Sequence, residues 1–362
     1  MKDIKVAYIH GRPSAHPMHQ KFAESVGGIF HPVDFRMRWQ DRNKSILYRI
    51  TSWFVCSFTF PHKKDYQVFL IDNLHFSPVI MKIFHLINRK QKIVAHMGSH
   101  TLYFIYAHRF SKFTEWLHIQ ALKRYDALIC EGVMAEELVR KILGKKTPKI
   151  YTVFMGIPKE HYPTEKSFTT NLDGKNILFI GNGPNKNRMW YKGLDLMISS
   201  FQLVKEQNTE LTLTIVGDWE EDVKQELLNS CNNKTRAAIN FCGSTTDLGK
   251  FTKNASLYIH CARGEAFGIT ILIAMAAGIP SFVSEWTGAK EVVEKVDSKL
   301  IVPIDEKIIA EKILWYFNLP LENKKQLSDK CREVVKGYTE ENAILFHQEK
   351  FAELVKDFDL IT

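Results

Sequence analysis

One stretch of the sequence, from Arg263 to Pro280, has residue types and spacing suited to holding an anion beside a carboxylate. It follows an apolar run, Leu257–His260, that predicts a strand, and its own pattern predicts a helix from Gly268 to Ala277. Gly268 lets a ligand approach the backbone, and the N–H groups that begin the helix attract negative charge such as a diphosphate. Glu265 stands just before this helix, where it can accept hydrogen bonds from sugar hydroxyls. The competing interpretation is an ordinary strand–loop–helix with a solvated glutamate.

The rest of the chain must position such loops, and its pattern predicts how. Short β-branched or aromatic runs alternate with helical stretches, which is typical of βαβ units and parallel sheets. In the first half we expect strands at Lys5–His10, Val68–Asp72, Lys92–His96, Ala127–Cys130 and Ile150–Phe154, and helices at His19–Ser25, Pro78–Ile87, Lys112–Arg124 and Ala135–Leu143. In the second half we expect strands at Asn176–Gly181, Thr212–Val216, Ile239–Cys242, Leu257–His260 and Ser281–Ser284, and helices at Leu194–Glu206, Glu221–Leu228, Leu248–Ala255, Gly268–Ala277 and Ala289–Glu294.

The length of the chain predicts more than one domain. Its 362 residues are too many for one compact core, and chain-breaking residues between Gly156 and Pro163 indicate a junction. We expect an α/β protein with two doubly wound parallel-sheet domains, residues 1–157 and 158–338. A C-terminal segment, 339–362, is predicted to form a helix that packs back on the first domain. Because ligands of open parallel sheets bind beyond the carboxyl ends of the strands, two such domains facing a cleft can hold one ligand each.

Composition and charge narrow the class of protein. The opening residues are too short and too charged for a secretory signal, and no apolar run reaches the roughly 18 residues of a membrane helix. The six cysteines are scattered without a Cys-x-x-Cys pair, which argues against a zinc site or disulfide framework and predicts a cytoplasmic protein. Residues 1–157 carry a net charge of +13 and residues 158–362 a net charge of −4. A basic surface attracts anionic membranes, nucleic acid or phosphorylated substrates.

The stretch that begins at Glu265 resembles the donor-site signature of glycosyltransferase family 4, the group 1 retaining enzymes with the GT-B fold. It matches their Glu-x-Phe-Gly, followed at the expected spacing by Ala-Met-Ala-x-Gly-x-Pro. Other segments are similar to motifs of this family in the same order: Val153–Pro158, Ile177–Gly181, Lys192–Asp195, Ile215–Asp218, Phe241–Gly243 and Trp286–Val293. The resemblance covers nearly all of residues 150–305 and is looser before them. It implies two Rossmann-like domains, the first binding an acceptor and the second a nucleotide-sugar donor.

The resemblance also implies roles for single residues in the second domain. Glu265 and Lys192 are expected to be catalytic, with Lys192 stabilising the negative charge of the leaving diphosphate. The expected donor-binding residues are Gly181, Asn182, Lys186, Arg188, Gly217, Asp218, Gly243, Ala266, Phe267, Gly268, Ile269, Thr270 and Ile273.

Two of these positions depart from the family pattern. Ile273 stands eight residues after Glu265, where the family has a second glutamate that grips the donor ribose, and isoleucine accepts no hydrogen bond. The ribose is therefore held otherwise, the donor binds more weakly, or the site is no longer catalytic. Asn182 occupies the place of an arginine, and Lys186 or Arg188, in a long loop before Lys192, are candidates to supply that charge.

On the acceptor side the signals are fewer. The family tends to place a histidine at the end of the strand that here reads Lys92–His96, where it reaches the transferred sugar, so His96 is the third expected catalytic residue and His100 the reserve. Gly11, Arg12 and Ser14 follow the first strand, and Asp72-Asn73-Leu74-His75 ends another. A structural histidine at a strand end is the competing interpretation of His96.

Retention in this family is thought to proceed on the front face of the sugar, with the donor phosphate taking the acceptor proton, so no protein nucleophile is expected. Asp357-Phe358-Asp359 spells the Asp-x-Asp metal motif of other transferases but lies outside any strand-end loop, and we interpret it as a solvated tail. We therefore expect no metal and no cofactor, with a nucleotide-sugar of the UDP or GDP type as substrate.

The basic and aromatic segment from Arg36 to Phe54 predicts either an interfacial helix on an anionic membrane or a basic amphipathic helix that packs on the core. The first alternative places the protein peripherally on the inner face of the membrane. Many relatives act on lipid-linked acceptors.

The sequence thus predicts a retaining, metal-independent hexosyl- or related transferase that acts on a glycan or lipid-linked glycan in surface polysaccharide or glycolipid biosynthesis. The alternative, motivated by Ile273, is a catalytically silent GT-B subunit that serves as a scaffold or glycan-binding partner. A dinucleotide-dependent oxidoreductase is disfavoured because Lys186 replaces the third glycine of Gly-x-Gly-x-x-Gly after Gly181-Asn182-Gly183. Nucleic-acid binding is disfavoured because no recognisable module is present.

Overall fold

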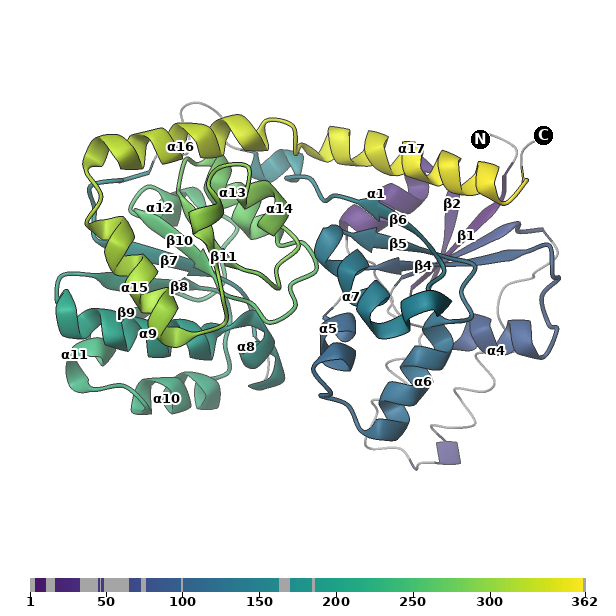
Figure 1. Ribbon diagram of the computed structural model, residues 1–362, viewed down its shortest axis with the longest axis horizontal. Coiled ribbons are helices and arrows are strands. Elements are labelled where there is room, and N and C mark those ends of the chain that lie inside the picture. The colour runs from purple at the N-terminus through teal and green to yellow at the C-terminus, as the bar shows by residue number, and fades with distance from the viewer. Residues whose placement is uncertain are drawn as a thin grey trace. The chain divides into compact units, whose positions relative to one another are not determined.

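The computed structural model describes residues 4–10, 17–32, 45, 47–48, 65–72, 76–98, 100–162, 170–183 and 186–360. The chain divides into two compact units (Figure 1). Unit 1 comprises Met1–Met155 and Glu340–Thr362, and unit 2 comprises Gly156–Thr339. Within the described part of the chain, no helix combines the length and hydropathy that a membrane span requires.

Unit 1 is built on a six-stranded parallel sheet with the order β2-β1-β3-β4-β5-β6. Its strands are β1 (Val6–His10), β2 (Gly28–Pro32), β3 (Val68–Asp72), β4 (Lys92–Met97), β5 (Ala127–Glu131) and β6 (Lys149–Val153). Its helices are α1 (Pro17–Ser25), α4 (Ser77–Ile83), α5 (Thr101–Tyr106), α6 (Lys112–Leu122), α7 (Val133–Leu143), the short 3₁₀ turn η1 (Gly144–Lys146) and α17 (Glu340–Asp357). All residues of β1, β3 and β5 are buried, as expected of central strands with helices on both faces.

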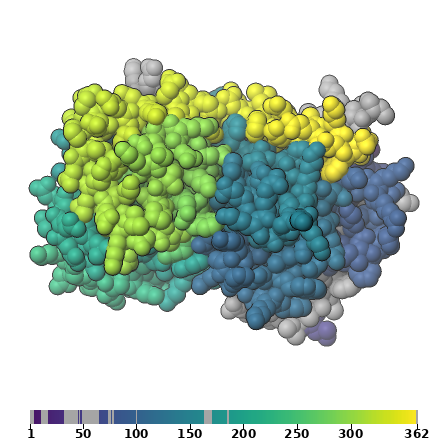
Figure 2. Space-filling view, viewed as in Figure 1, coloured from purple at the N-terminus to yellow at the C-terminus, as the bar shows by residue number. Residues whose placement is uncertain are grey.

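The C-terminal helix α17 belongs to the core of unit 1. It runs beside α1 and β6 (Figure 1), with its outer side exposed at the surface (Figure 2). Phe351, Leu354 and Val355 on its inner side join the apolar cluster formed by the strands. Asp357, the first residue of the Asp-x-Asp sequence, accepts from the Nζ of Lys149 and the hydroxyl of Tyr151, both on β6.

Unit 2 repeats the architecture with the strand order β12-β11-β10-β7-β8-β9, again all parallel. Its strands are β7 (Asn176–Ile180), β8 (Thr212–Val216), β9 (Ile239–Phe241), β10 (Leu257–His260), β11 (Ser281–Ser284) and β12 (Ile301–Val302). Its helices are α8 (Lys186–Lys192), α9 (Leu194–Gln207), α10 (Glu221–Asn229), α11 (Asn233–Arg236), α12 (Gly249–Thr252), α13 (Ile269–Ala276), α14 (Lys290–Val293), α15 (Glu306–Phe317) and α16 (Leu321–Val335), with 3₁₀ turns η2 (Lys159–His161) and η3 (Ser298–Leu300). The strand order reverses between β7 and β10, and the loops beyond the carboxyl ends of β7, β8 and β10 therefore meet at a topological switch point.

The structure departs from the sequence expectations at a few elements. The stretch before Lys192, expected to be a loop, contains the helix α8. The edge strand β2 lacks an apolar run and ends in Pro32, and the two-residue strand β12 is too short to give a periodic signal. Both were missed because strand prediction rests on runs of at least about four β-forming residues.

Removal of a core side chain from α17 tests its place in unit 1. The side chain of Phe351 is 1% exposed, so Phe351→Ala should destabilise unit 1 by about 3–5 kcal/mol through lost burial and a cavity. Leu345 on the same helix is 62% exposed, and Leu345→Ala should change stability by less than about 0.5 kcal/mol. Urea unfolding followed by hydrogen exchange on peptides of β4 and β5 measures both. Equal losses in the two variants would contradict a core role for α17.

Candidate functional site

An ion pair in unit 2 joins Lys192, the last residue of α8, to Glu265, in the loop between β10 and α13. Both side chains are mostly buried, with 13% and 16% of their surface exposed. The Nε2 of His260 also donates to Oε2 of Glu265 at 3.2 Å. Burial would raise the pKa of Glu265, but the charge of Lys192 and the bond from His260 outweigh it and hold this pKa well below its ordinary value. Glu265 is therefore an ionised acceptor at neutral pH.

The backbone around Glu265 is shaped by glycines and a neighbouring loop. Gly268 has φ of 93°, and a Cβ there would lie 2.6 Å from Cδ1 of Ile271 and 3.2 Å from Cγ of Glu265. The N–H of Gly288 donates to the carbonyl of Glu265 at 3.0 Å, and that of Ala289 donates to the carbonyl of Phe267 at 2.8 Å. The segment Trp286–Val293 therefore acts on the site through its backbone, by holding the loop that carries Glu265.

Arg263 ties α8 and α9 to the same loop. Its Nη1 donates to the carbonyl of Trp190 at 2.6 Å and to Oδ1 of Asp195 at 2.8 Å, and its guanidinium lies 5.0 Å from the centroid of the Trp190 ring. Gly193, with φ of 73°, packs against the carbonyl of Cys261, where a Cβ would approach to 2.0 Å. Lys192 is thus positioned by its neighbours in sequence and by Arg263, which sequence reasoning did not single out.

The loops that follow β7, β8 and β9 meet as one group. Oδ1 of Asn182 accepts from the N–H of Asp218 at 2.9 Å and from the hydroxyl of Ser244 at 3.2 Å, and Oδ1 of Asp218 accepts from the N–H of Ser244 at 2.8 Å. The N–H of Gly217 donates to the carbonyl of Gly243 at 2.8 Å. A Cβ at Gly217 would lie 2.1 Å from the carbonyl oxygen of Gly181. The structure therefore brings these predicted residues together, with Asn182 bridging two loops.

Other predicted donor-binding residues are placed differently. Lys186 is exposed and paired with Glu226 on α10, and Nε of Arg188 donates to the carbonyl of Asn182 at 2.5 Å. Ile269 and Thr270, the first residues of α13, are partly exposed. The side chains of Ala266, Phe267 and Ile273 are buried, at 7%, 1% and 2% exposure, and belong to the core.

In unit 1 the predicted acceptor-side residues divide into three groups. Gly11, Arg12, Ser14 and residues 73–75 lie outside the described residues. His100 is partly exposed, and its ring contacts Phe104 with 4.7 Å between centroids. His96 has no exposed surface, so in this structure its side chain is not accessible to a sugar.

His96 instead belongs to a buried network of ionisable side chains at the carboxyl ends of the strands. Nε2 of His10 lies 2.8 Å from Oδ2 of Asp72, and Nδ1 of His19 lies 3.0 Å from Oδ1 of the same carboxylate. Nε2 of His19 and Nε2 of His96 lie 2.6 Å and 3.3 Å from Oε1 of Glu131. Sequence reasoning named only His96 and Asp72 of this set.

The charge of His19 compensates part of the negative charge of the two carboxylates in this network. Burial would lower the pKa of His19, but the charges of Glu131 and Asp72 raise it well above its ordinary value. Burial would raise the pKa of each carboxyl, yet His19 holds both below their ordinary values. An imidazolium at this position has a carboxylate partner at each ring nitrogen, 3.0 Å from Asp72 and 2.6 Å from Glu131. Gly98 leaves room for the carboxylate of Glu131, because a Cβ at this position would lie 2.5 Å from Oε1.

Three members of the network have the chemistry of metal ligands. His19, Asp72 and His96 each offer a ligand atom, all within 4.8 Å of one another. A metal ligand must be a neutral imidazole, whereas each ring nitrogen of His19 already faces a carboxylate. The contacts therefore fit a hydrogen-bonded charge network better than a metal centre.

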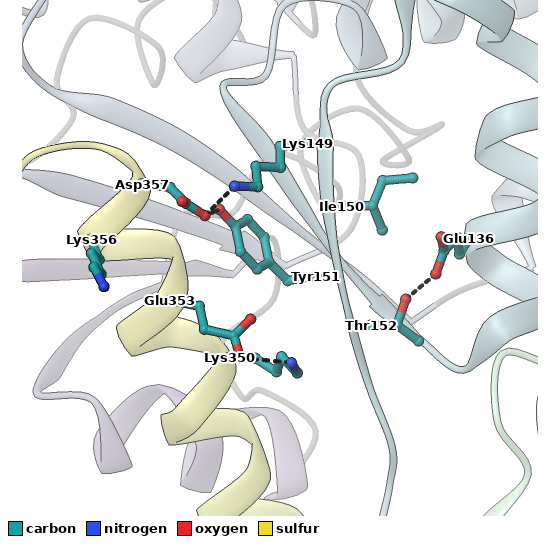
Figure 3. A pocket seen from close by; sticks show the side chains of 9 residues that line it. All are labelled: Glu136, Lys149, Ile150, Tyr151, Thr152, Lys350, Glu353, Lys356 and Asp357. Carbon is teal, nitrogen blue, oxygen red and sulfur yellow. Dashed lines mark hydrogen bonds and ion pairs between the residues drawn. The ribbon is translucent and has the colours of Figure 1, made fainter.

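A pocket of about 550 Å³ lies between β6 and α17 (Figure 3). Its lining is polar but internally paired, with ion pairs from Lys149 to Asp357 and from Lys350 to Glu353. None of the residues predicted for donor or acceptor lines this pocket.

The raised pKa of His19 predicts how the stability of unit 1 depends on pH. A base whose pKa is higher in the folded state contributes stability that is complete below its unfolded pKa, near 6.5, and is lost as pH rises through the folded pKa. Unit 1 of the wild type should therefore lose stability above about pH 7. His19→Gln should be less stable at neutral pH by about 3 kcal/mol, because a buried charge loses its partner, and should lack this alkaline loss.

Hydrogen exchange on peptides of α1 and β5, corrected for the intrinsic pH dependence of exchange, measures these profiles. His108→Gln is the matched control, because the side chain of His108 is 79% exposed. Parallel pH profiles for the wild type and His19→Gln would refute an imidazolium at this position.

The match to a known protein family lies within the second unit. Residues 174–318 match the family model described as Glycosyl transferases group 1. An uncharacterized glycosyltransferase of Haemophilus influenzae is 23% identical over 245 residues, which are 66% of this chain and 67% of that protein. The phosphatidyl-myo-inositol mannosyltransferase of Mycobacterium leprae is 30% identical over 145 residues, 39% of this chain. The alignment spans only 37% of the mycobacterial protein.

Solved structures match the fold of nearly the whole chain. The sucrose-phosphate synthase of Thermosynechococcus elongatus has a TM-score of 0.71 at 14% identity, covering 98% of this chain and 100% of that chain. The Anabaena protein HepE, in complex with UDP and glucose, has a TM-score of 0.69 at 14% identity, covering 98% and 99%. These findings confirm the predicted α/β class, GT-B fold and family resemblance. The chain therefore has the GT-B fold, and residues 174–318 of its second unit match the group 1 glycosyltransferase family.

Proposed function

We propose that the protein is a retaining glycosyltransferase that moves a sugar from a nucleotide-sugar to a glycan or lipid-linked glycan acceptor, in surface polysaccharide or glycolipid biosynthesis. The observation that carries this proposal is the pairing of Lys192 with an ionised Glu265 immediately before α13. The cation of Lys192, the carboxylate of Glu265 and the N-terminus of α13 then lie together beyond the carboxyl ends of β7 and β10. This combination suits a ligand with a diphosphate at one end and hydroxyls at the other.

Each group has a distinct task in the proposed reaction. Glu265 accepts hydrogen bonds from hydroxyls of the transferred sugar, which orients the ring. The Nζ of Lys192 turns from Glu265 toward the donor phosphates and stabilises the charge that grows on the leaving diphosphate. The backbone at Gly268 and the first turn of α13 hold the same phosphates. His96, whose side chain is buried, then acts by fixing the loop after β4 and not by touching the sugar.

Front-face retention and metal independence are part of the proposal. The groups bonded to the carboxylate of Glu265 are the nitrogens of Lys192 and His260, which differs from the paired carboxylates of a glycosidase. In the proposed step the donor phosphate takes the acceptor proton, the bond from the anomeric carbon to that phosphate breaks, and the acceptor oxygen bonds to the same face. Lys192 supplies positive charge at the place where other transferases use a metal.

A donor of the UDP or GDP type is proposed. The related solved structure of HepE contains UDP and glucose, and the mycobacterial relative is named as a mannosyltransferase. These names support a nucleoside diphosphate that carries a hexose.

Nucleotide binding is the first test of this proposal. UDP or GDP at millimolar concentration should raise the Tm of the wild type by a few degrees, because a ligand that binds only the folded state stabilises it by mass action. Lys192→Ala should remove most of this shift, since a charge-assisted contact contributes about 1.5–3 kcal/mol. The matched control is Lys325→Ala, an exposed lysine of α16, whose shift should equal that of the wild type.

The silent-subunit alternative makes the opposite prediction and is favoured by the buried Ile273. No shift with UDP, GDP, ADP or TDP would support it and would contradict the proposed transferase. A nucleotide shift without turnover of any matching nucleotide-sugar would assign the protein to the same silent class.

We also propose peripheral binding at the cytoplasmic face of the membrane. This membrane proposal is based on the segment Arg36–Phe54, most of which lies outside the described residues. Within the described part of the segment, Leu47 and Tyr48 are exposed. The purified protein should sediment with vesicles that contain anionic lipid and not with phosphatidylcholine vesicles, and salt should weaken this binding. Equal sedimentation with both kinds of vesicle would rule the membrane proposal out.

A further inference from the structure

We propose that Tyr258 and His260 form an ordered hydrogen-bond relay that runs from Thr270, in the first turn of α13, to the carboxylate of Glu265, and that His260 is a positioning residue for the sugar-binding end of the site. The inference deepens the proposed function and rests on it where it concerns the sugar. The relay itself is a property of unit 2 alone.

The geometry of the relay is continuous and buried. Oγ1 of Thr270 lies 2.9 Å from the hydroxyl oxygen of Tyr258, which lies 3.2 Å from Nδ1 of His260. Nε2 of His260 lies 3.2 Å from Oε2 of Glu265. Tyr258 is fully buried and His260 is 1% exposed. Buried polar groups of this kind are stable only when each finds a partner, and each link here has one.

The acceptor at the end of the relay determines the direction of every proton. An ionised Glu265 only accepts, so Nε2 of His260 must carry the proton that it shares with Oε2. With a neutral ring, Nδ1 is then an acceptor, and the hydroxyl of Tyr258 must donate to it. The oxygen of Tyr258 in turn accepts from the hydroxyl of Thr270. One tautomer and one orientation of two hydroxyls satisfy the whole relay.

Charge balance supports the neutral ring of His260. The positive charge of Lys192 already compensates Glu265, and a buried imidazolium would leave a net positive charge at a cost in solvation energy. Burial lowers the pKa of His260, while its bond to Glu265 opposes this shift only in part.

Packing holds the His260 ring where the relay needs it. The ring stacks on Phe179 of β7, with 5.7 Å between centroids and 10° between planes. Rotation about its side-chain bonds is thereby restricted, so the proton on Nε2 stays directed at Glu265. Lys192, at the end of α8, donates a hydrogen bond to the same oxygen, Oε2. When Lys192 turns to the donor phosphates, His260 is the contact that keeps the carboxylate in place for the sugar.

Three variants isolate the relay. His260→Phe keeps the stacking ring and removes the donor, whereas His260→Gln restores an N–H donor near the position of Nε2. Tyr258→Phe removes only the hydroxyl that fixes the tautomer. Tyr316→Phe is the matched control, because the Tyr316 hydroxyl is also buried in unit 2 and donates to the carbonyl of Ser256 at 2.6 Å.

The first measurement is ¹⁵N NMR of histidine-labelled full-length protein at neutral pH, with the His260 signals assigned from their loss in His260→Gln. The wild type should show a protonated Nε2 and a bare Nδ1, and Tyr258→Phe should shift the ring toward a mixture of tautomers. A protonated Nδ1 in the wild type, or no change in Tyr258→Phe, would overturn the relay. This result does not depend on any ligand.

The second measurement compares binding of UDP with UDP-glucose, and of GDP with GDP-mannose, by thermal shift and calorimetry. His260→Phe should bind the bare nucleotide within about 3-fold of the wild type. It should bind the nucleotide-sugar about 10-fold or more weakly, as expected when a hydrogen bond to a charged group is lost. His260→Gln should recover most of the difference.

The outcomes separate the two proposals. Equal weakening of nucleotide and nucleotide-sugar by His260→Phe would mean a merely structural role and would overturn the positioning proposal. No binding of any nucleotide by the wild type would defeat the proposed function, and the NMR result would then decide the relay alone.

Discussion

The constraint on which the second unit depends is that Glu265 must remain ionised while mostly buried. A carboxylate in that environment is stable only with a cation and directed hydrogen bonds around it. Lys192 supplies the cation from α8 and His260 supplies the hydrogen bond from the end of β10. Because these groups come from different elements, α8 and the loop before α13 must be held at a fixed position relative to each other. The bonds from Arg263 to the carbonyl of Trp190 and to Asp195 do this, and the backbone bonds from Gly288 and Ala289 fix the loop from its other side.

Unit 1 also contains buried carboxylates that require a compensating charge, but different residues provide it. The carboxylates of Asp72 and Glu131 end β3 and β5, and parallel pairing brings these strand ends to one edge of the sheet. His19 lies between them on α1 and neutralises part of their charge. The first unit thus compensates part of its buried negative charge through one imidazolium, whereas the second compensates Glu265 with a lysine at a helix end. A lysine amine on a flexible stem can turn toward an incoming anion, whereas His19, facing a carboxylate at each ring nitrogen, cannot turn without breaking both contacts. This difference supports the proposed placement of the donor site in unit 2.

Sequence reasoning recovered what is encoded locally. The central strands were found because their apolar runs are buried on both faces, and the loop at Glu265 was found because Gly268, the helix start and the carboxylate lie within a few residues of one another. His19 has no local signal, because its partners are 53 and 112 residues away in sequence and the fold alone brings them together. His260 did have a signal. It is a polar residue that ends a fully buried strand, as are His10, Asp72 and Glu131, and polar strand ends taken as a set would have indicated both clusters.

The buried Ile273 limits how the proposed donor site could be built, because it stands where the family pattern has a glutamate. The sequence of α13, Ile-Thr-Ile-Leu-Ile-Ala-Met-Ala, is apolar nearly all round, and the residues from Ile271 to Met275 are buried. A glutamate at position 273 would enter this core, where an unpaired carboxylate is costly. In the proposed site, α13 can therefore contact a donor only through the first turn and the backbone of the helix. Hydrogen bonds to a ribose would have to come from the loops after β7, β8 and β9. Those loops already bind one another through Asn182, Asp218 and Ser244, so the polar groups available there are held in place before a ligand arrives.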